Sequence, residues 1–278
     1  MARNNNVSMK VGSDCSLKDV GWVWEGRTFH PGTEPSIFGV GEGAVYFGLR
    51  RVVYIFHPNT DLAMQKLSNF EEVTCDISKR KFSCTKDHLL KQYIDSAPPT
   101  VGAEATKVSK LSLKYHNITG GFHDDMFGAT QRESGGFEHY AWNIFEGIRN
   151  ALHAANSTLK LWGAVYTQEL NSPLWQNFLP YIDIVNLWVW HARDLRQLDE
   201  HIVLCRKIFP NKPINLGCYM REYPAQSPLP MNLLRFQWER VRRYLDKGLI
   251  NGYSILGALE IDFQQEQAEW IRGFIAKH

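Results

Sequence analysis

Apolar residues along the chain follow two alternating patterns. Short runs rich in Val, Ile, Tyr and Trp predict strands, and longer segments with apolar residues three and four positions apart predict amphipathic helices. The two patterns alternate from one end of the chain to the other, so we expect a parallel sheet whose strands are joined by helices. The predicted strands span residues 20–24, 51–56, 72–77, 118–124, 159–167, 183–190, 213–220 and 252–259.

Four of the segments between or after these strands carry a single apolar stripe at helical spacing. The stripes consist of Phe137, Tyr140, Ile144, Ile148, Leu152 and Ala155; Leu195, Leu198, Ile202, Cys205 and Phe209; Leu234, Trp238, Val241 and Leu245; and Ala268, Ile271 and Ile275. Gly248 follows the third stripe as a C-cap, and residues 38–48 read as a helix with glycines at packing or capping points. Each stripe can cover one face of a buried sheet.

About eight such units in 278 residues predict a single (β/α)8 TIM barrel that forms one domain over residues 1–278. The rival fold, a doubly wound open sheet, requires a phosphate-binding glycine fingerprint after the first strand, and "GWVWEGRTFHPG" contains none. Residues 95–112 read as an elaborated crossover, in which Pro98 and Pro99 break a helix that resumes before the fourth strand.

Composition narrows the classes of partner. The chain is 44% hydrophobic, and 31 basic against 29 acidic residues leave a formal charge of +2, so neither nucleic acid nor a membrane is an expected partner. The five cysteines lack zinc spacing. Most are expected to be buried and reduced, and Cys75 and Cys84 could alternatively close a short loop. No cofactor motif is present, and the first residues lack a signal core, which leaves a cytoplasmic enzyme or a secreted form without its signal.

Polar residues gather where the predicted strands end. In a TIM barrel these carboxyl ends and the following loops build the active site. The residues at these positions are His57, Asp76, Asp124, Asp125, Glu169, His191, Arg221, Glu222, Glu260 and Asp262. Acids crowded around one mouth raise one another's pKa values, so one can stay protonated as a general acid while another is an ionised carboxylate. Glycoside hydrolysis requires such a pair.

Aromatic residues accompany the acids. Flat rings with polar edges suit the faces of sugars, so a carbohydrate is the expected partner. The aromatic residues at the same strand ends are Trp22, Trp24, Tyr166, Trp188, Trp190 and Tyr219.

These residues resemble those of the (β/α)8 glycoside hydrolases. The resemblance rests on "FHDDMFG" at the end of strand four, "YTQEL" at the end of strand five and "LWVWH" on strand six. Several families of that group use carboxylates at the ends of strands four and five, so the resemblance implies a carbohydrate-active enzyme. It indicates no single family, and the Asp-x-x-Asp-x-Asp-x-Glu signature of barrel chitinases is absent.

The predicted catalytic pair is Asp125 and Glu169, with Glu169 as the acid and Asp125 as nucleophile or base. Asp124 and Glu222 are further catalytic candidates, although strand alternation turns Glu222 outward if Arg221 faces inward. The same alternation prevents Asp124 and Asp125 from both facing inward while the strand continues. The predicted substrate-binding residues are His123, Tyr166, Trp188, Trp190, His191, Tyr219, Arg221 and Trp24.

Simpler structural roles and two other functions fit the same residues. Adjacent aspartates often cap a helix, and a salt bridge to a neighbouring loop would explain Glu169. Glu260 and Asp262 could cap the last helix, and tryptophans in barrels often belong to the core. Glu169, His191, Glu222 and Glu260 could instead hold a divalent metal in a sugar isomerase or epimerase. A barrel that binds sugar without reacting is the third alternative.

Overall fold

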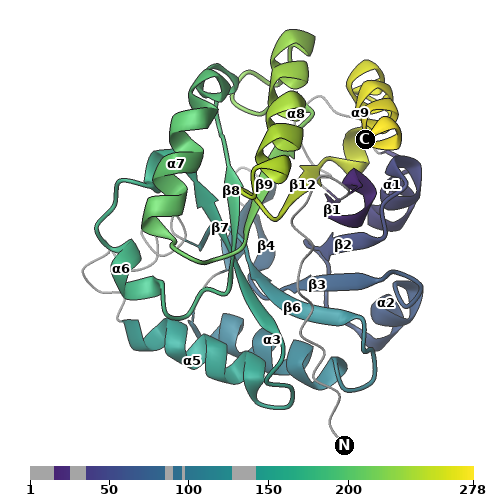
Figure 1. The fold of residues 1–278 in the computed structure, drawn as a ribbon. Coiled ribbons are helices and arrows are strands. Elements are labelled where there is room, and N and C mark those ends of the chain that lie inside the picture. The colour runs from purple at the N-terminus through teal and green to yellow at the C-terminus, as the bar shows by residue number, and fades with distance from the viewer. Residues whose placement is uncertain (1–15, 26–35, 85–89, 96–97, 127–141) are drawn as a thin grey trace, which may run out of the picture.

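The computed structural model describes residues 16–25, 36–84, 90–95, 98–126 and 142–278. Eight parallel strands close a barrel in the order β1-β12-β9-β8-β7-β6-β3-β2, with β1 paired to both β12 and β2 (Figure 1). The barrel strands are β1 (Gly21–Trp24), β2 (Arg51–Tyr54), β3 (Glu72–Asp76), β6 (Ile118–His123), β7 (Lys160–Tyr166), β8 (Ile184–Trp188), β9 (Ile214–Tyr219) and β12 (Gly252–Leu256). The predicted TIM barrel is confirmed, and each predicted strand contains one of these eight.

Helices surround the barrel, as Figure 1 shows. They are α1 (Val40–Phe47), α2 (Asp61–Lys66), α3 (Pro98–Leu111), α5 (Trp142–His153), α6 (Trp175–Phe178), α7 (Leu198–Ile208), α8 (Met231–Asp246) and α9 (Gln265–Lys277). The described parts of the four predicted apolar stripes fall on α5, on α7 and its flanks, on α8 and on α9, whereas Phe137 and Tyr140 lie outside the described residues. None of the helices in the described ranges is long and apolar enough to cross a membrane.

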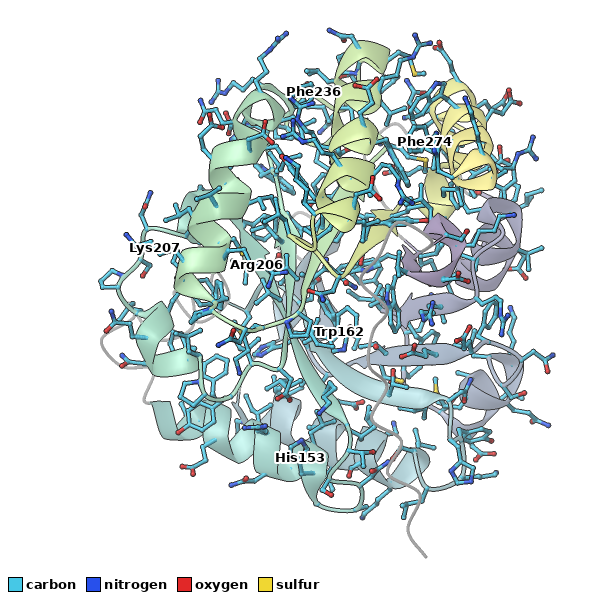
Figure 2. The ribbon with its side chains drawn as sticks, viewed as in Figure 1. His153, Trp162, Arg206, Lys207, Phe236 and Phe274 are labelled. Atoms are coloured by element: carbon cyan, nitrogen blue, oxygen red, sulfur yellow. The ribbon has the colours of Figure 1, made fainter. Side chains whose placement is uncertain are left out.

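The apolar residues form two cores. The larger core lies between the outer face of the sheet and the helices, and includes Leu152, Ile202 and Trp238. The smaller core fills the barrel and consists largely of aromatic rings, among them Trp162, which Figure 2 shows among the strands. Both cores are needed because a parallel barrel strand buries both of its faces.

Three glycines have the capping or packing roles predicted from the sequence. Gly48 ends α1 in the left-handed conformation at φ 69°, and Gly248 follows α8 in the same conformation at φ 65°, as expected for residues that terminate helices. Gly43 of α1 faces Ala258, whose Cβ would lie 2.5 Å from a Cβ at Gly43. The interpretation of these glycines as capping and packing residues is confirmed.

The segment between β3 and β6 differs from the prediction. An antiparallel hairpin of β4 (Lys79–Cys84) and β5 (Leu90–Asp95) precedes α3. Pro98 and Pro99 do not break a helix, because they occupy the first turn of α3, where a missing N–H and a fixed φ are tolerated. The elaboration therefore lies mainly before residue 95, and the following segment is one regular helix.

Short 3-10 helices follow several strand ends and carry candidate site residues. Those beyond β7, β8 and β12 are η3 (Thr167–Glu169), η4 (Ala192–Gln197) and η5 (Ala258–Glu260), and η1 (Leu17–Asp19) precedes β1. A two-residue pair, β10 (Arg221–Glu222) with β11 (Ser227–Pro228), extends the chain beyond β9. The turns beyond β7, β8, β9 and β12 lie at the carboxyl-terminal mouth of the barrel, whereas η1 lies at the amino-terminal end of β1.

Candidate active site

Asp124 and Asp125 both reach the mouth, because β6 ends at His123. Asp124 continues the inward register of Phe122 and is 5% exposed. Asp125 adopts φ 43°, a conformation that non-glycine residues seldom use, and its half-buried carboxylate accepts a 2.8 Å hydrogen bond from the Tyr166 hydroxyl. The left-handed residue breaks the alternation that would otherwise turn one aspartate away. Backbone strain of this kind is common at functional sites.

Tyr166, at the end of the neighbouring strand β7, contacts both predicted catalytic acids. Its hydroxyl donates to Asp125, and its backbone N–H donates to Oε2 of Glu169 at 2.9 Å. Burial raises the pKa of Glu169 to about 7, and the negative charge of Asp125 raises it further against the opposing effect of the Tyr166 N–H. One residue thus joins a carboxylic acid that holds its proton near neutral pH to a second carboxyl group.

An aromatic wall stands beside this pair. Trp190 is half-buried, lies parallel to Tyr223 at 5.8 Å between ring centroids, and meets Tyr166 edge-on at 5.9 Å. Tyr219 packs against Tyr223 at 5.0 Å. Burial, followed by the charge of Asp125, raises the pKa of Tyr219 well above its ordinary value. Sequence reasoning identified Trp190, Tyr166 and Tyr219 but missed Tyr223, which lies beyond the predicted strand.

A third acid lies on η5, beyond the strand opposite β6 in the barrel. Glu260 is 4% exposed, its Oε1 accepts a 2.9 Å hydrogen bond from the Tyr223 hydroxyl, and its Oε2 is enclosed without a partner. Burial raises the pKa of Glu260 to about 7, whereas the Tyr223 hydrogen bond and the positive charge of Arg221 lower it. Glu260 and Asp124 both also raise the pKa of Tyr219, so the two sides of the mouth share one electrostatic environment.

A further pair lies at the ends of β1 and β2. Glu25 is 8% exposed, and its Oε2 lies 2.5 Å from Nε2 of His57, whose ring stacks on Tyr54. His57 was expected at the rim, whereas Glu25 was missed. Its position immediately after the first predicted strand was the signal that could have identified it.

Three predicted substrate-binding residues lie away from the open mouth. His123 faces the helices, packs against Phe145 of α5 and has both ring nitrogens enclosed without hydrogen bonds; burial lowers its pKa to about 4. Trp24 and Trp188 are 3% and 1% exposed, and their rings contact each other edge-on inside the barrel. These side chains are therefore corrected to packing residues, and Trp22 is buried in the same inner core.

Glu222 and His191 lie at the edge of the mouth. Glu222 lines a small cavity together with the preceding residue, Arg221, and with Val189 and Leu229, both of which are buried. His191 is half-buried and immediately precedes η4. Within the described ranges no three His, Cys, Asp or Glu side chains are grouped so that they could hold a metal ion, and the quartet predicted from sequence therefore does not converge.

Comparisons with known proteins find similar folds among solved structures. No protein-family model and no curated protein sequence matches the chain. Among solved structures, a glucosidase from Croceicoccus marinus superposes with a TM-score of 0.61 at 10% identity, over 96% of this chain and 69% of that one. A GH18 chitinase from Pseudoalteromonas aurantia superposes with a TM-score of 0.54 at 11% identity, over 93% of this chain and 99% of the chitinase.

A β-glucuronidase from Bacteroides uniformis gives a TM-score of 0.53 at 11% identity, over 87% of this chain. The match covers 30% of the glucuronidase, which is therefore a much longer protein. Identities this low concern the fold alone. The chain is a (β/α)8 barrel of the kind found in glycoside hydrolases.

Proposed function

We propose that this protein is a glycoside hydrolase whose catalytic pair is Asp125 and Glu169. The observation that carries the proposal is their shared contact with Tyr166, which donates a hydrogen bond to each carboxyl group from two different atoms. Adjacent barrel strands hold the two acids at one edge of the mouth. Two carboxyl groups in different environments are the minimum equipment of either glycosidase mechanism.

Their surroundings suggest different roles. Glu169 has a pKa of about 7, raised chiefly by burial, and can deliver its proton to the leaving oxygen as the bond to the anomeric carbon breaks. Asp125 is half-buried and accepts the Tyr166 hydrogen bond, so it can attack the anomeric carbon or take a proton from the attacking water. The anomeric configuration of the first product, followed by NMR, distinguishes these two roles.

The aromatic wall fits a sugar ring as substrate. Trp190 retains exposed surface while Tyr223 supports its opposite face, which leaves a flat apolar surface beside the acids. A ring that stacks on a sugar contributes about 1 kcal/mol beyond its buried area. Asp124 and Glu260 add further hydrogen-bond acceptors for hydroxyl groups.

The test is a screen of aryl glycosides and oligosaccharides, run with and without a chelator, on the wild type and on Asp125→Asn and Glu169→Gln. Each substitution keeps the shape of the side chain and should lower kcat by at least 10²-fold. Glu239→Gln, an exposed position on α8, provides the matched control and should leave kcat unchanged.

Three outcomes would contradict the proposal. Near-normal turnover by either variant removes that residue from the reaction. Sugar binding without turnover of any glycoside indicates the non-catalytic barrel. Activity on free sugars that the chelator abolishes indicates a metal-dependent isomerase.

A further inference from the structure

Arg221 is a buried cation, and the part of the chain that the structure describes supplies it with no direct partner. The residue is 5% exposed, and its Nε is enclosed without a hydrogen bond. No ion pair or hydrogen bond joins its guanidinium to a residue in the described ranges, whereas the less deeply buried Arg206 (Figure 2) donates to the carbonyls of Leu249 and Lys212 and to the side chain of Asn251. Burying a charge without a partner costs several kcal/mol, so an unpaired guanidinium is an unusual feature.

The guanidinium faces the candidate active site. Arg221 lines a small cavity together with Trp190 and Tyr219, and Tyr219 is part of the inner core. Its positive charge acts on two residues of the mouth, because it lowers the pKa values of both Glu260 and Tyr223. Arg221 therefore lies beside the aromatic wall and on the side of the mouth that carries Glu260.

The nearby acids leave this charge uncompensated. Glu260 forms no ion pair with Arg221. Its carboxyl group accepts a hydrogen bond from the Tyr223 hydroxyl, and its burial favours the protonated form. Glu222, the next residue, lines the same small cavity as Arg221, but the two side chains form no ion pair. A ligand that brings its own negative charge would complete the site.

We propose that Arg221 binds an anionic substituent, a carboxylate or a sulfate, on the sugar that occupies the mouth. The inference rests on the proposed function and narrows its substrate class to acidic sugars. A guanidinium fork matches two oxygens of such a group with two parallel hydrogen bonds, and these bonds are strong where water is excluded. With the sugar ring against Trp190, the Tyr223 and Glu260 pair lies next to the charged group and can bind a neighbouring hydroxyl.

The test uses aryl glycosides that differ only in the substituent at C6: a hydroxymethyl group, a carboxylate or a sulfate ester. The carboxylate and sulfate arms distinguish the two sources of charge. We expect kcat/KM for one anionic substrate to exceed that for the neutral one by about 10²-fold, the magnitude of one or two charge-assisted hydrogen bonds. Arg221→Gln should abolish this preference, Arg221→Lys should keep part of it, and Arg235→Gln, which removes an exposed charge from α8, should leave it unchanged.

Binding and stability measurements keep the inference testable if no glycoside is cleaved. Calorimetry with the free neutral, carboxylated and sulfated sugars should show the same preference and the same dependence on Arg221. Removal of an unpaired buried charge should leave the Tm of Arg221→Gln unchanged or higher, whereas a structural role would lower it. The inference is overturned, and the proposed function stays intact, if the protein cleaves neutral glycosides and Arg221→Gln does not alter its preference between neutral and anionic substrates. Equal binding of all three sugars overturns it in the absence of turnover.

Discussion

The pH dependence of Glu169 offers a direct test of its assignment as the acid. With a pKa of about 7, Glu169 is about half protonated at pH 7 and about 1% protonated at pH 9, so kcat/KM of the wild type should fall about 50-fold between these pH values. Glu169→Gln cannot donate this proton. The variant should lose about 10² to 10⁴ in rate on a poor leaving group, and much less on dinitrophenyl glycosides, whose leaving group needs little protonation.

The same substitution should change stability in a direction that follows from the sign of the shift. The pKa of Glu169 rises from its ordinary 4.5 to about 7 on folding, so the folded state holds a proton that the unfolded chain has already released. Its contribution to stability is complete below pH 4.5 and is lost progressively as pH rises through 7. The difference of about 2.5 between the two pKa values corresponds to at most about 3 kcal/mol, because the side chain is only half-buried. Relative to the wild type, Glu169→Gln should therefore become more stable as pH rises from 5 to 8.

Steady-state kinetics and urea unfolding from pH 5 to pH 9 measure both effects. Glu260 makes the comparison decisive, because its pKa is also about 7 and Glu260→Gln should produce a similar change in stability. The loss of activity above pH 7 should disappear in Glu169→Gln and persist in Glu260→Gln. The reverse result would refute the assignment and identify Glu260 as the acid.

Three further substitutions test separate parts of the structure. Tyr166→Phe removes the hydroxyl that donates to Asp125 and should lower kcat about tenfold with little change in KM, measured by steady-state kinetics; a change in KM alone would contradict a role in orienting the carboxylate. Trp190→Ala should weaken sugar binding by about 1 kcal/mol in calorimetry and leave the fold intact, whereas unfolding with unchanged affinity of the folded fraction would show that the ring is core. Gly217→Ala places a Cβ 2.1 Å from the Trp188 ring and should lower the free energy of unfolding by about 1–3 kcal/mol in urea, and an unchanged midpoint would show that the inner core can relax.

The sequence specified the barrel because its signal is local. Each strand buries both faces and therefore reads as an apolar run, and each helix covers the sheet with one apolar stripe, so both periods are visible along the chain. The hairpin formed by β4 and β5 was missed, since it interrupts the regular alternation. The prediction that Pro98 and Pro99 break a helix is wrong, because the sequence alone does not separate the first turn of a helix from its interior.

The candidate site was predicted in part, because strand ends are a reliable guide to position but a poor guide to orientation. The sequence located Asp124, Asp125 and Glu169 at the mouth, and the structure adds that Tyr166 contacts both members of the proposed pair. Alternation alone could not admit both aspartates, and the left-handed backbone of Asp125 resolved the conflict. That conformation depends on contacts beyond the strand, which no sequence period records.

What only the tertiary structure decided is which side chains meet across the barrel. Arg221 and Glu260 belong to different strand ends far apart in sequence, and their burial beside Tyr223 results from closure of the barrel. His123 and Trp188 are of residue types that suit the proposed site, yet one faces a helix and the other fills the barrel interior. Residue type and position along the chain were determined by the sequence, whereas burial, and with it the pKa values that separate the proposed acid from its partner, arises only when distant segments exclude water together.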